Sequence, residues 1–214
     1  MKSRMVAVAL AAQLLGLACA AHAADAPLAG SAEAGAAKAA TCGACHGPTG
    51  NSANPEWPSL AGQHHEYIAE QLALLKSGAR LAPVMNPMAA TLGPQDIADL
   101  AAYFERQTLV GLEADATLAE AGQKLYRGGD AARGIPACLA CHGPNGRGNG
   151  PARWPQVRAQ QPAYAMAQLR NFAAKTRYAP GAAAPPGAEM MTDVAKRLSE
   201  DDIKALTAYL QGLR

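Results

Sequence analysis

The stretch Cys42-Gly43-Ala44-Cys45-His46 organises this chain, and it occurs a second time as Cys138-Leu139-Ala140-Cys141-His142. C-x-x-C-H is the attachment pattern of c-type haem. In that pattern two thiols bind the porphyrin covalently, and the adjoining histidine ligates the iron. A redox dithiol or half of a zinc site can also contain C-x-x-C, but the sequence shows neither a βαβ pattern nor two further zinc ligands nearby. We therefore predict two covalently bound haem c groups.

The first residues predict export. Lys2 and Arg4 precede an apolar run over residues 5–20, and residues 21–23 form an A-x-A cleavage site. Together these features are typical of a secretory signal peptide, here residues 1–23. The apolar run is short for a membrane-spanning helix, and Cys19 lacks the leucine that a lipoprotein signal places three positions earlier. We expect a periplasmic protein whose four remaining cysteines all belong to the haem motifs.

The composition agrees with a haem protein, whereas the distribution of charge between the two halves has two interpretations. The chain has two Phe and two Trp and is rich in Ala, so either half would struggle to build a sufficient core without the bulk of a porphyrin. Residues 24–112 hold eight acidic and four basic side chains, and residues 113–214 hold nine and thirteen, which gives net charges of −4 and +4. The two halves are either plain solvated surfaces or the poles of a dipole that orients the molecule on a partner. Neither has the mixture of basic and aromatic residues typical of nucleic-acid binding.

Two copies of one unit account for the mature chain. Four residues recur 97 positions later, and three near the end of the first unit recur 106 positions later. The first set pairs Tyr67, Gln71, Leu72 and Arg80 with Tyr164, Gln168, Leu169 and Arg177; the second pairs Ile97, Leu100 and Tyr103 with Ile203, Leu206 and Tyr209. We predict two domains, residues 24–107 and 118–214, joined by a linker over residues 108–117.

Each unit is expected to contain three helices and no strand. Apolar side chains at helical spacing predict a helix over residues 64–77. Pro94 suits a first helical position, and Ser199 with Asp202 resembles a capping box. The other helices are expected at residues 33–40, 94–107, 118–126, 163–175 and 200–210.

A c-type iron usually takes a second axial ligand, and the repeat selects one methionine in each unit. Met85 lies seven residues before Leu92, which precedes the last helix of the first unit, and Met191 lies seven residues before Leu198 in the second. Two neighbours, Met88 and Met190, have no counterpart in the other unit. That these methionines only fill gaps in the core stays an alternative, because Met packs adaptably.

Two further sets of residues border the predicted sites. His64 and His65 are rival ligands, but their counterparts are Gln161 and Pro162, so the repeat favours exposed polar roles for them. Pro58 and Pro155 follow the haem motifs in equivalent places. Their carbonyls could accept the N–H of the axial imidazole, or they could simply shape a turn.

The chain resembles the dihaem cytochrome c4 family over essentially its whole mature length. The matching stretches are residues 42–48 (CGACHGP), 50–52 (GNS), 58–63 (PSLAGQ), 124–129 (KLYRGG), 135–138 (IPAC), 141–146 (CHGPNG) and 148–149 (GN). The last helix of each unit is also similar to that family.

The resemblance implies two class I cytochrome c folds facing each other, and a periplasmic carrier that passes electrons toward a terminal oxidase. It assigns His46 with Met85 to one iron and His142 with Met191 to the other, and Cys42, Cys45, Cys138 and Cys141 to the porphyrins. It gives Pro58 and Pro155 the carbonyl role, and it places Gly35 and Gly122 where the first and last helices cross. Implied partners are redox proteins such as a membrane oxidase or reductase complex, with peripheral membrane association and no small-molecule substrate.

The chain departs from the family pattern in the loops before Met85 and Met191, the second of which is the Pro/Ala-rich stretch over residues 178–187. Arg158-Ala159 also replaces the pair found at Ala61-Gly62. Two rival functions are compatible with parts of the pattern. An enzyme such as a dihaem peroxidase would need an open coordination site, which equivalent methionines in both units argue against. A cytochrome subunit of a dehydrogenase or oxidase complex would look the same in sequence.

Overall fold

The computed structural model describes residues 28–214, so the expected signal peptide over residues 1–23 lies outside the described residues. Over the described range the chain forms helices and three isolated β-bridges, which confirms the all-α prediction. The helices are α1 (Ala32–Lys38), α2 (Ala40–His46), α3 (His65–Lys76), α4 (Met85–Ala90), α5 (Pro94–Glu105), α6 (Ala116–Gly128), α7 (Leu139–His142), α8 (Pro162–Ala173), α9 (Pro186–Ala195) and α10 (Glu200–Gly212).

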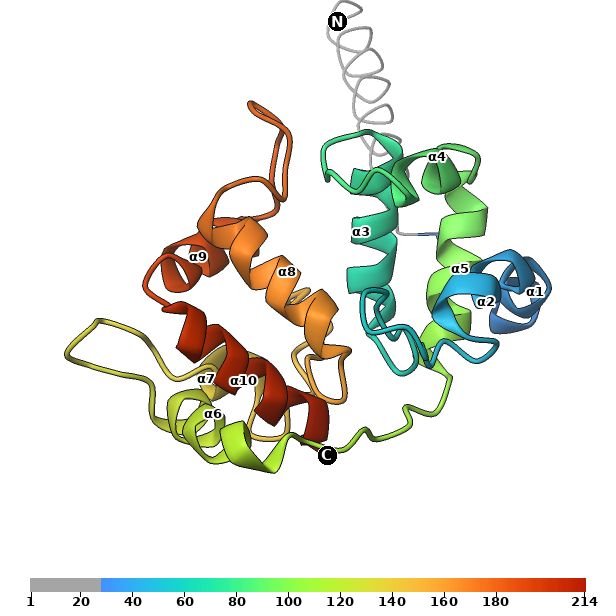
Figure 1. The fold of residues 1–214 in the computed structure, drawn as a ribbon. Coiled ribbons are helices and arrows are strands. Elements are labelled where there is room, and N and C mark those ends of the chain that lie inside the picture. The colour runs from blue at the N-terminus through green and yellow to red at the C-terminus, as the bar shows by residue number, and fades with distance from the viewer. Residues whose placement is uncertain (1–27) are drawn as a thin grey trace, which may run out of the picture.

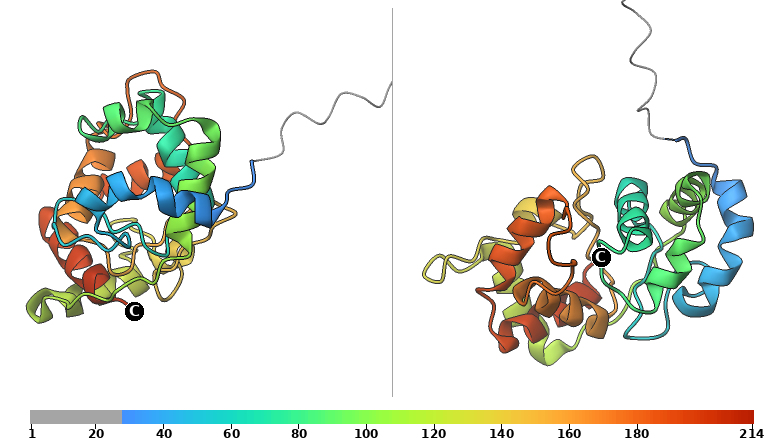
Figure 2. Two further views of the ribbon diagram at one scale, coloured as in Figure 1. Left: turned by 90° about the vertical axis from the view of Figure 1, so that its right-hand side faces the viewer. Right: turned by 90° about the horizontal axis from the view of Figure 1, so that it is seen from above.

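The helices form two groups that repeat one arrangement. In the first, α5 packs against α1 and α3; in the second, α10 packs against α6 and α8. The segment before α6 joins the groups along one edge of the molecule, and α3 and α8 face each other between them (Figure 1). The view from above shows the same side-by-side arrangement (Figure 2, right). No helix within residues 28–214 is long and apolar enough to cross a membrane.

A glycine allows the first and last helices of each group to cross in contact. A Cβ placed on Gly35 of α1 would lie 2.1 Å from the carbonyl oxygen of Asp99 in α5. A Cβ on Gly122 of α6 would lie 2.0 Å from the carbonyl oxygen of Ala205 in α10. Any side chain at these positions would push the two backbones apart. The expectation that both glycines lie where the first and last helices of a unit cross is therefore confirmed.

We predict that Gly122→Ala lowers the free energy of unfolding by about 1–3 kcal/mol, because the added methyl group must separate α6 from α10. The matched control is Gly128→Ala at the end of the same helix, where a Cβ meets nothing within 4 Å. That change should leave stability unchanged or slightly higher, since Ala favours helix over Gly. Chemical denaturation followed by circular dichroism compares the two, and equal stability would contradict the crossing argument.

The ends of several helices follow the sequence, but four helices were not predicted: α2, α4, α7 and α9. Pro94 stands at the start of α5, and Ser199 and Asp202 form the predicted capping box of α10. The expectation of three helices per unit was wrong, because α4, α9 and the short helices that carry the haem motifs are additional. These segments are only 4 to 10 residues long, so they present too few apolar positions to show a helical period.

A buried carboxylate strengthens the first unit. The Asp99 side chain is only 4% exposed, and it accepts hydrogen bonds from Lys38 Nζ (2.7 Å), Ser31 N (2.8 Å) and Gln95 Nε2 (2.9 Å). These donors, Lys38 first, lower the pKa of Asp99 to about 2. The equivalent position in the second unit is Ala205, so this cluster belongs to the first unit alone.

We predict that Asp99→Asn destabilises the protein at pH 7 and that the loss shrinks in acid. A carboxylate whose pKa is depressed by folding contributes fully above its unfolded pKa, about 3.9, and stops contributing as the pH falls through its folded pKa. The stability gap should therefore narrow below about pH 4 and nearly close near pH 2. Denaturation curves from pH 2 to 8 measure it, with the exposed Asp201→Asn as control; a gap that is constant with pH would indicate lost packing instead.

Paired glutamine side chains hold the two units together. Gln63 Nε2 donates to the carbonyl oxygen of Gln156 (2.9 Å), whose N–H donates back to Gln63 Oε1 (2.9 Å). Gln160 makes the equivalent pair of bonds with the backbone of Ser59 (3.0 and 2.8 Å). Gln63 and Gln160 occupy equivalent places in the two units, so the contact has approximate two-fold symmetry. Because these bonds bury polar groups with their partners satisfied, they fix the relative orientation of the units.

Candidate haem sites

The four motif cysteines lie on the two short helices that carry the histidines. Cys42 and Cys45 are in α2 and Cys141 is in α7, with Cys138 at its N-cap, and none of the four forms a disulfide. Burial raises the pKa of Cys42, and it raises the pKa of Cys138 to about 11. Reactive C-x-x-C pairs of oxidoreductases have lowered pKa values instead. The environment of these thiols therefore disfavours the redox-dithiol alternative.

Each motif histidine is held by a proline carbonyl. His46 Nδ1 lies 2.8 Å from the carbonyl oxygen of Pro58, and His142 Nδ1 lies 3.0 Å from that of Pro155. In the tautomer that donates from Nδ1, the lone pair remains on Nε2, where a metal can bind. Burial also lowers the pKa of both imidazoles, more than the carbonyl contact raises it, which favours the neutral ligating form. The predicted carbonyl role of both prolines is confirmed.

The proline carbonyls are positioned by one turn that occurs in both units. Leu60 N donates to the carbonyl oxygen of Gly50 (2.7 Å), and Val157 N donates to that of Gly146 (2.8 Å). Gly50 has φ +77°, and a Cβ there would lie 2.8 Å from the Phe104 ring, so a side chain is excluded on both counts. The turn thereby connects the loop after each haem motif to the residues that orient its histidine.

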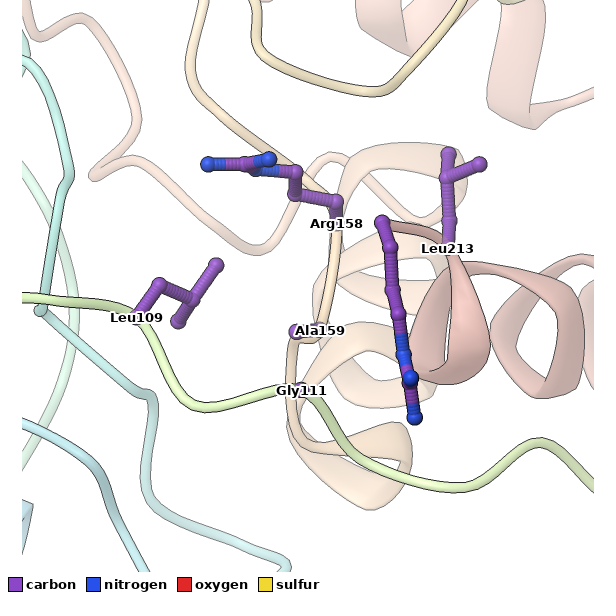
Figure 3. Close-up of a pocket in the computed structure, with 6 residues that line it drawn as sticks. Leu109, Gly111, Arg158, Ala159 and Leu213 are labelled. Atoms are coloured by element: carbon purple, nitrogen blue, oxygen red, sulfur yellow. The ribbon is translucent and has the colours of Figure 1, made fainter.

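The departure at Arg158-Ala159 changes side chains and leaves the backbone arrangement intact. Ala159 has φ +47°, in the region that favours glycine, where Gly62 has +68°. Ala159 N donates to the carbonyl oxygen of Leu210 (2.8 Å), as Gly62 N does to that of Phe104 (2.9 Å). Arg158 lines a shallow open cleft beside the linker, with Leu109, Gly111, Ala159, Leu213 and Arg214, and extends away from Leu213 (Figure 3).

The candidate methionines differ from their neighbours in exposure. Met85 begins α4 and is partly buried, whereas Met88 of the same helix is 45% exposed. In α9, Met191 is partly buried and Met190 is 49% exposed. The less exposed residue of each pair is the one that the repeat selects. The assignment of Met85 and Met191 as ligands stays a prediction.

His64 and His65 have polar partners of their own. His64 Nε2 lies 2.7 Å from the carbonyl oxygen of Arg147, and His65 Nδ1 lies 2.9 Å from both carboxylate oxygens of Glu105. The side chain of His65 is 53% exposed. This agrees with the polar role that the sequence favoured for them.

The donor set fits covalent haem in both units. Each motif offers two thiols and one imidazole on a single short helical segment; the imidazole is buried in the first unit, partly buried in the second, and already oriented through Nδ1 in both. Haem supplies a one-electron iron couple when it is bound. In the predicted assignment, Cys42, Cys45, Cys138 and Cys141 would anchor the porphyrins, and His46 and His142 would supply ligand nitrogens that the protein already holds in place.

Comparison with known proteins agrees with this geometry. The cytochrome c family model matches residues 32–107 and again residues 119–214. Cytochrome c4 of Azotobacter vinelandii is 45% identical over 195 residues, which cover 86% of this chain and 90% of that protein. The chain belongs to the cytochrome c4 family. It therefore carries two covalently bound haem c groups, one in each tandem domain, and it is an electron-transfer protein.

Two further relatives place it within the dihaem cytochromes. The crystal structure of reduced recombinant cytochrome c4 from Pseudomonas stutzeri superposes with a TM-score of 0.81 at 43% identity, covering 87% of this chain and all of that one. The thiosulfate dehydrogenase electron acceptor of Thiomonas intermedia is 35% identical over 178 residues, which cover 81% of this chain and 78% of that protein.

Replacement of the methionines tests the ligand assignment in this cytochrome c4 family member. Met85→Ala should remove half of the weak near-infrared band of thioether–iron ligation and lower one reduction potential, because Met ligation raises the potential of haem iron. The exposed neighbour offers a matched control, since Met88→Ala should change neither quantity. Met191→Ala and Met190→Ala should behave in the same way at the second haem. The reverse result within either pair would show that the register of that methionine segment was misread.

Proposed function

We propose that this protein is a periplasmic electron carrier of a respiratory chain that passes electrons toward a terminal oxidase and turns over no substrate. The observation that carries the proposal is the duplicated ligand set. In each unit a carbonyl-bound histidine is followed by a methionine at the same distance from the last helix. Two irons with Met as second ligand would have no vacant position for a substrate, and Met ligation suits a high potential late in a chain.

The division of charge supports a carrier that docks in a preferred orientation. Residues 24–112 carry a net charge of −4, and residues 113–214 carry +4. The basic excess of the second unit includes Arg147, Arg158 and Arg214. A dipole of this kind would turn the second unit toward an acidic partner surface and speed the encounter.

A second candidate function follows from one relative. The protein from Thiomonas intermedia is named as an electron acceptor of thiosulfate dehydrogenase. A chain of the same architecture could take electrons from such a dehydrogenase before it passes them on. This candidate changes the donor and leaves the role of the haems as it is.

Ligand binding and salt dependence test the carrier proposal together. If Met85 and Met191 ligate their irons, the reduced protein should bind carbon monoxide negligibly at neutral pH, and peroxidase turnover should be near background. Electron transfer to oxidase-containing membranes should slow as salt increases, because exposed charges are screened beyond about 10 Å at 0.1 M. Rapid carbon monoxide binding with substrate turnover at one haem would refute the proposal in favour of an enzyme.

The donor is tested by mixing the oxidised protein with a purified thiosulfate dehydrogenase and thiosulfate, and separately with membranes supplied with a respiratory reductant. Fast reduction by the dehydrogenase alone favours the second candidate. Reduction by the membranes alone favours the respiratory chain.

A further inference from the structure

One side chain joins the methionine helix of the first unit to the helix before it. Asn86 directly follows Met85 in α4. Its Nδ2 donates to the carbonyl oxygens of Leu75 (2.8 Å) and Arg80 (2.8 Å), and its Oδ1 accepts from Ala82 N (2.8 Å). Leu75 belongs to α3, whereas Arg80 and Ala82 lie between α3 and α4. Asn86 thus connects the start of α4 to the end of α3 and to the loop between them.

A second side chain holds the other end of the same helix. Lys76 ends α3, and its Nζ donates to the carbonyl oxygens of Leu92 and Ala90 (3.4 Å). Ala90 is the last residue of α4, and carbonyl groups at a helix C-terminus are commonly satisfied by a lysine in this way. Since α4 has only six residues, attachments at both ends leave it little freedom to move away from α3.

The methionine helix of the second unit lacks both attachments. The position equivalent to Asn86 is Thr192, one residue after the candidate methionine, and the position equivalent to Lys76 is Ala173. Within the described part of the chain, the Thr192 side chain forms no hydrogen bond, and the side-chain hydrogen bonds of residues 186–198 do not reach α8. α3 and α4 lie together, as do α8 and α9 (Figure 1), so the two units differ in the bonds and not in the arrangement.

The segment that leads to α9 is also less tied to its own unit. Residues 77–84 connect α3 to α4, whereas the longer stretch over residues 174–185 connects α8 to α9. Ala179 N donates to the first unit, at the carbonyl oxygen of Ala79 (2.9 Å). From there to α9, the described hydrogen bonds are local, such as that from Ala182 N to the carbonyl oxygen of Ala179 (3.0 Å). α9 therefore depends on packing against α8 for its position.

This difference bears on how easily each methionine is displaced from iron. Ferric iron is a hard cation, so an imidazole competes well with a soft thioether sulfur, whereas softer ferrous iron keeps the thioether. The competing ligand can bind only after the segment that carries the methionine has opened locally. The free energy of such an opening depends on the contacts and hydrogen bonds that it breaks. Opening of α4 breaks the bonds of Asn86 and Lys76, and opening of α9 breaks no equivalent bonds.

We propose that Asn86, together with Lys76, is the positioning residue that keeps Met85 on the first iron. The second unit has no such residue, so Met191 is the ligand that an added base displaces first from the ferric protein. This inference rests on the methionine ligation that the proposed function contains. It makes the two haems, which have the same type of ligands, unequal in their resistance to an external ligand.

Titration of the oxidised holoprotein with imidazole tests the difference between the haems. Loss of the near-infrared thioether–iron band reports displacement, and NMR signals of the ligated methionine methyl groups assign each step to one haem. Two steps are expected, with Met191 displaced at an imidazole concentration about tenfold lower than Met85, which corresponds to the net contribution of one or two hydrogen bonds. Displacement of both methionines at the same concentration, or of Met85 first, would overturn the proposal.

Substitution of Asn86 tests the residue itself. Asn86→Leu is close to the original in volume and removes all three hydrogen bonds, so the concentration that displaces Met85 should fall by about tenfold while the step of Met191 stays in place. Lys76→Met keeps the aliphatic stem and should act in the same direction. Thr192→Val is the matched control at the equivalent position of the second unit, and it should leave both steps unchanged.

The outcomes separate positioning from general stability and from ligation. An unchanged titration of Asn86→Leu would overturn the proposal, as would an equal shift at both haems, because a change confined to α4 should reach one iron only. Haem content and circular dichroism verify folding, and Lys76→Met keeps the test available if Asn86→Leu does not fold. Should Met85→Ala retain the whole near-infrared band, the ligation in the proposed function fails; a halved band with an unresponsive Asn86→Leu refutes the positioning role alone.

Discussion

The hydrogen bond between each motif histidine and a proline carbonyl is the contact on which both halves of the molecule depend. It joins His46 to Pro58 at 2.8 Å and His142 to Pro155 at 3.0 Å. The bond leaves Nε2 of each imidazole as the nitrogen that would ligate an iron, and burial lowers the pKa of the ring, which favours its neutral form. It also requires the segment after each motif to fold back, which is achieved by the turn at Gly50 and its counterpart at Gly146. The same turn and the same hydrogen bond therefore determine both the local fold and the orientation of the imidazole in each unit.

The contact between the units is polar where a domain interface is often apolar. Glutamine side chains pair with backbone groups in both directions, and buried arginines reach across to tyrosines. Directional bonds of this kind define one relative orientation, because sliding the units would leave buried donors and acceptors unpaired. A carrier with two haems benefits from such a contact, since electron exchange between the haems needs a constant separation.

Equivalent positions in the repeat have diverged in ways that make the two units unequal. Asp99 anchors three donors in the first unit, where the second has Ala205. The Arg177 guanidinium lies against the rings of Phe172 and Tyr178, whose counterparts in the first unit are leucines. Net charge has opposite sign in the two halves. The common fold preserves the haem sites, and these differences supply the means to give each haem its own potential and its own partner surface.

Much of the fold and of the haem sites could be predicted from the sequence, because the determining signals are local. The C-x-x-C-H motifs name the cofactor, and the register of the repeat adds Met85 and Met191 as predicted ligands. Glycine where two helices cross and proline at the start of α5 are likewise readable from short patterns. Only the tertiary structure decided how the units meet. Gln63 and Gln71 recur in the repeat, but which atoms they contact depends on the docking of α3 near α8 (Figure 1). Gln71 is an acceptor shared by two arginines, whereas its counterpart Gln168 is partly buried and lacks that role. Recurrence in the repeat cannot distinguish these two cases, because packing and burial decide which hydrogen-bond partners distant in sequence come together.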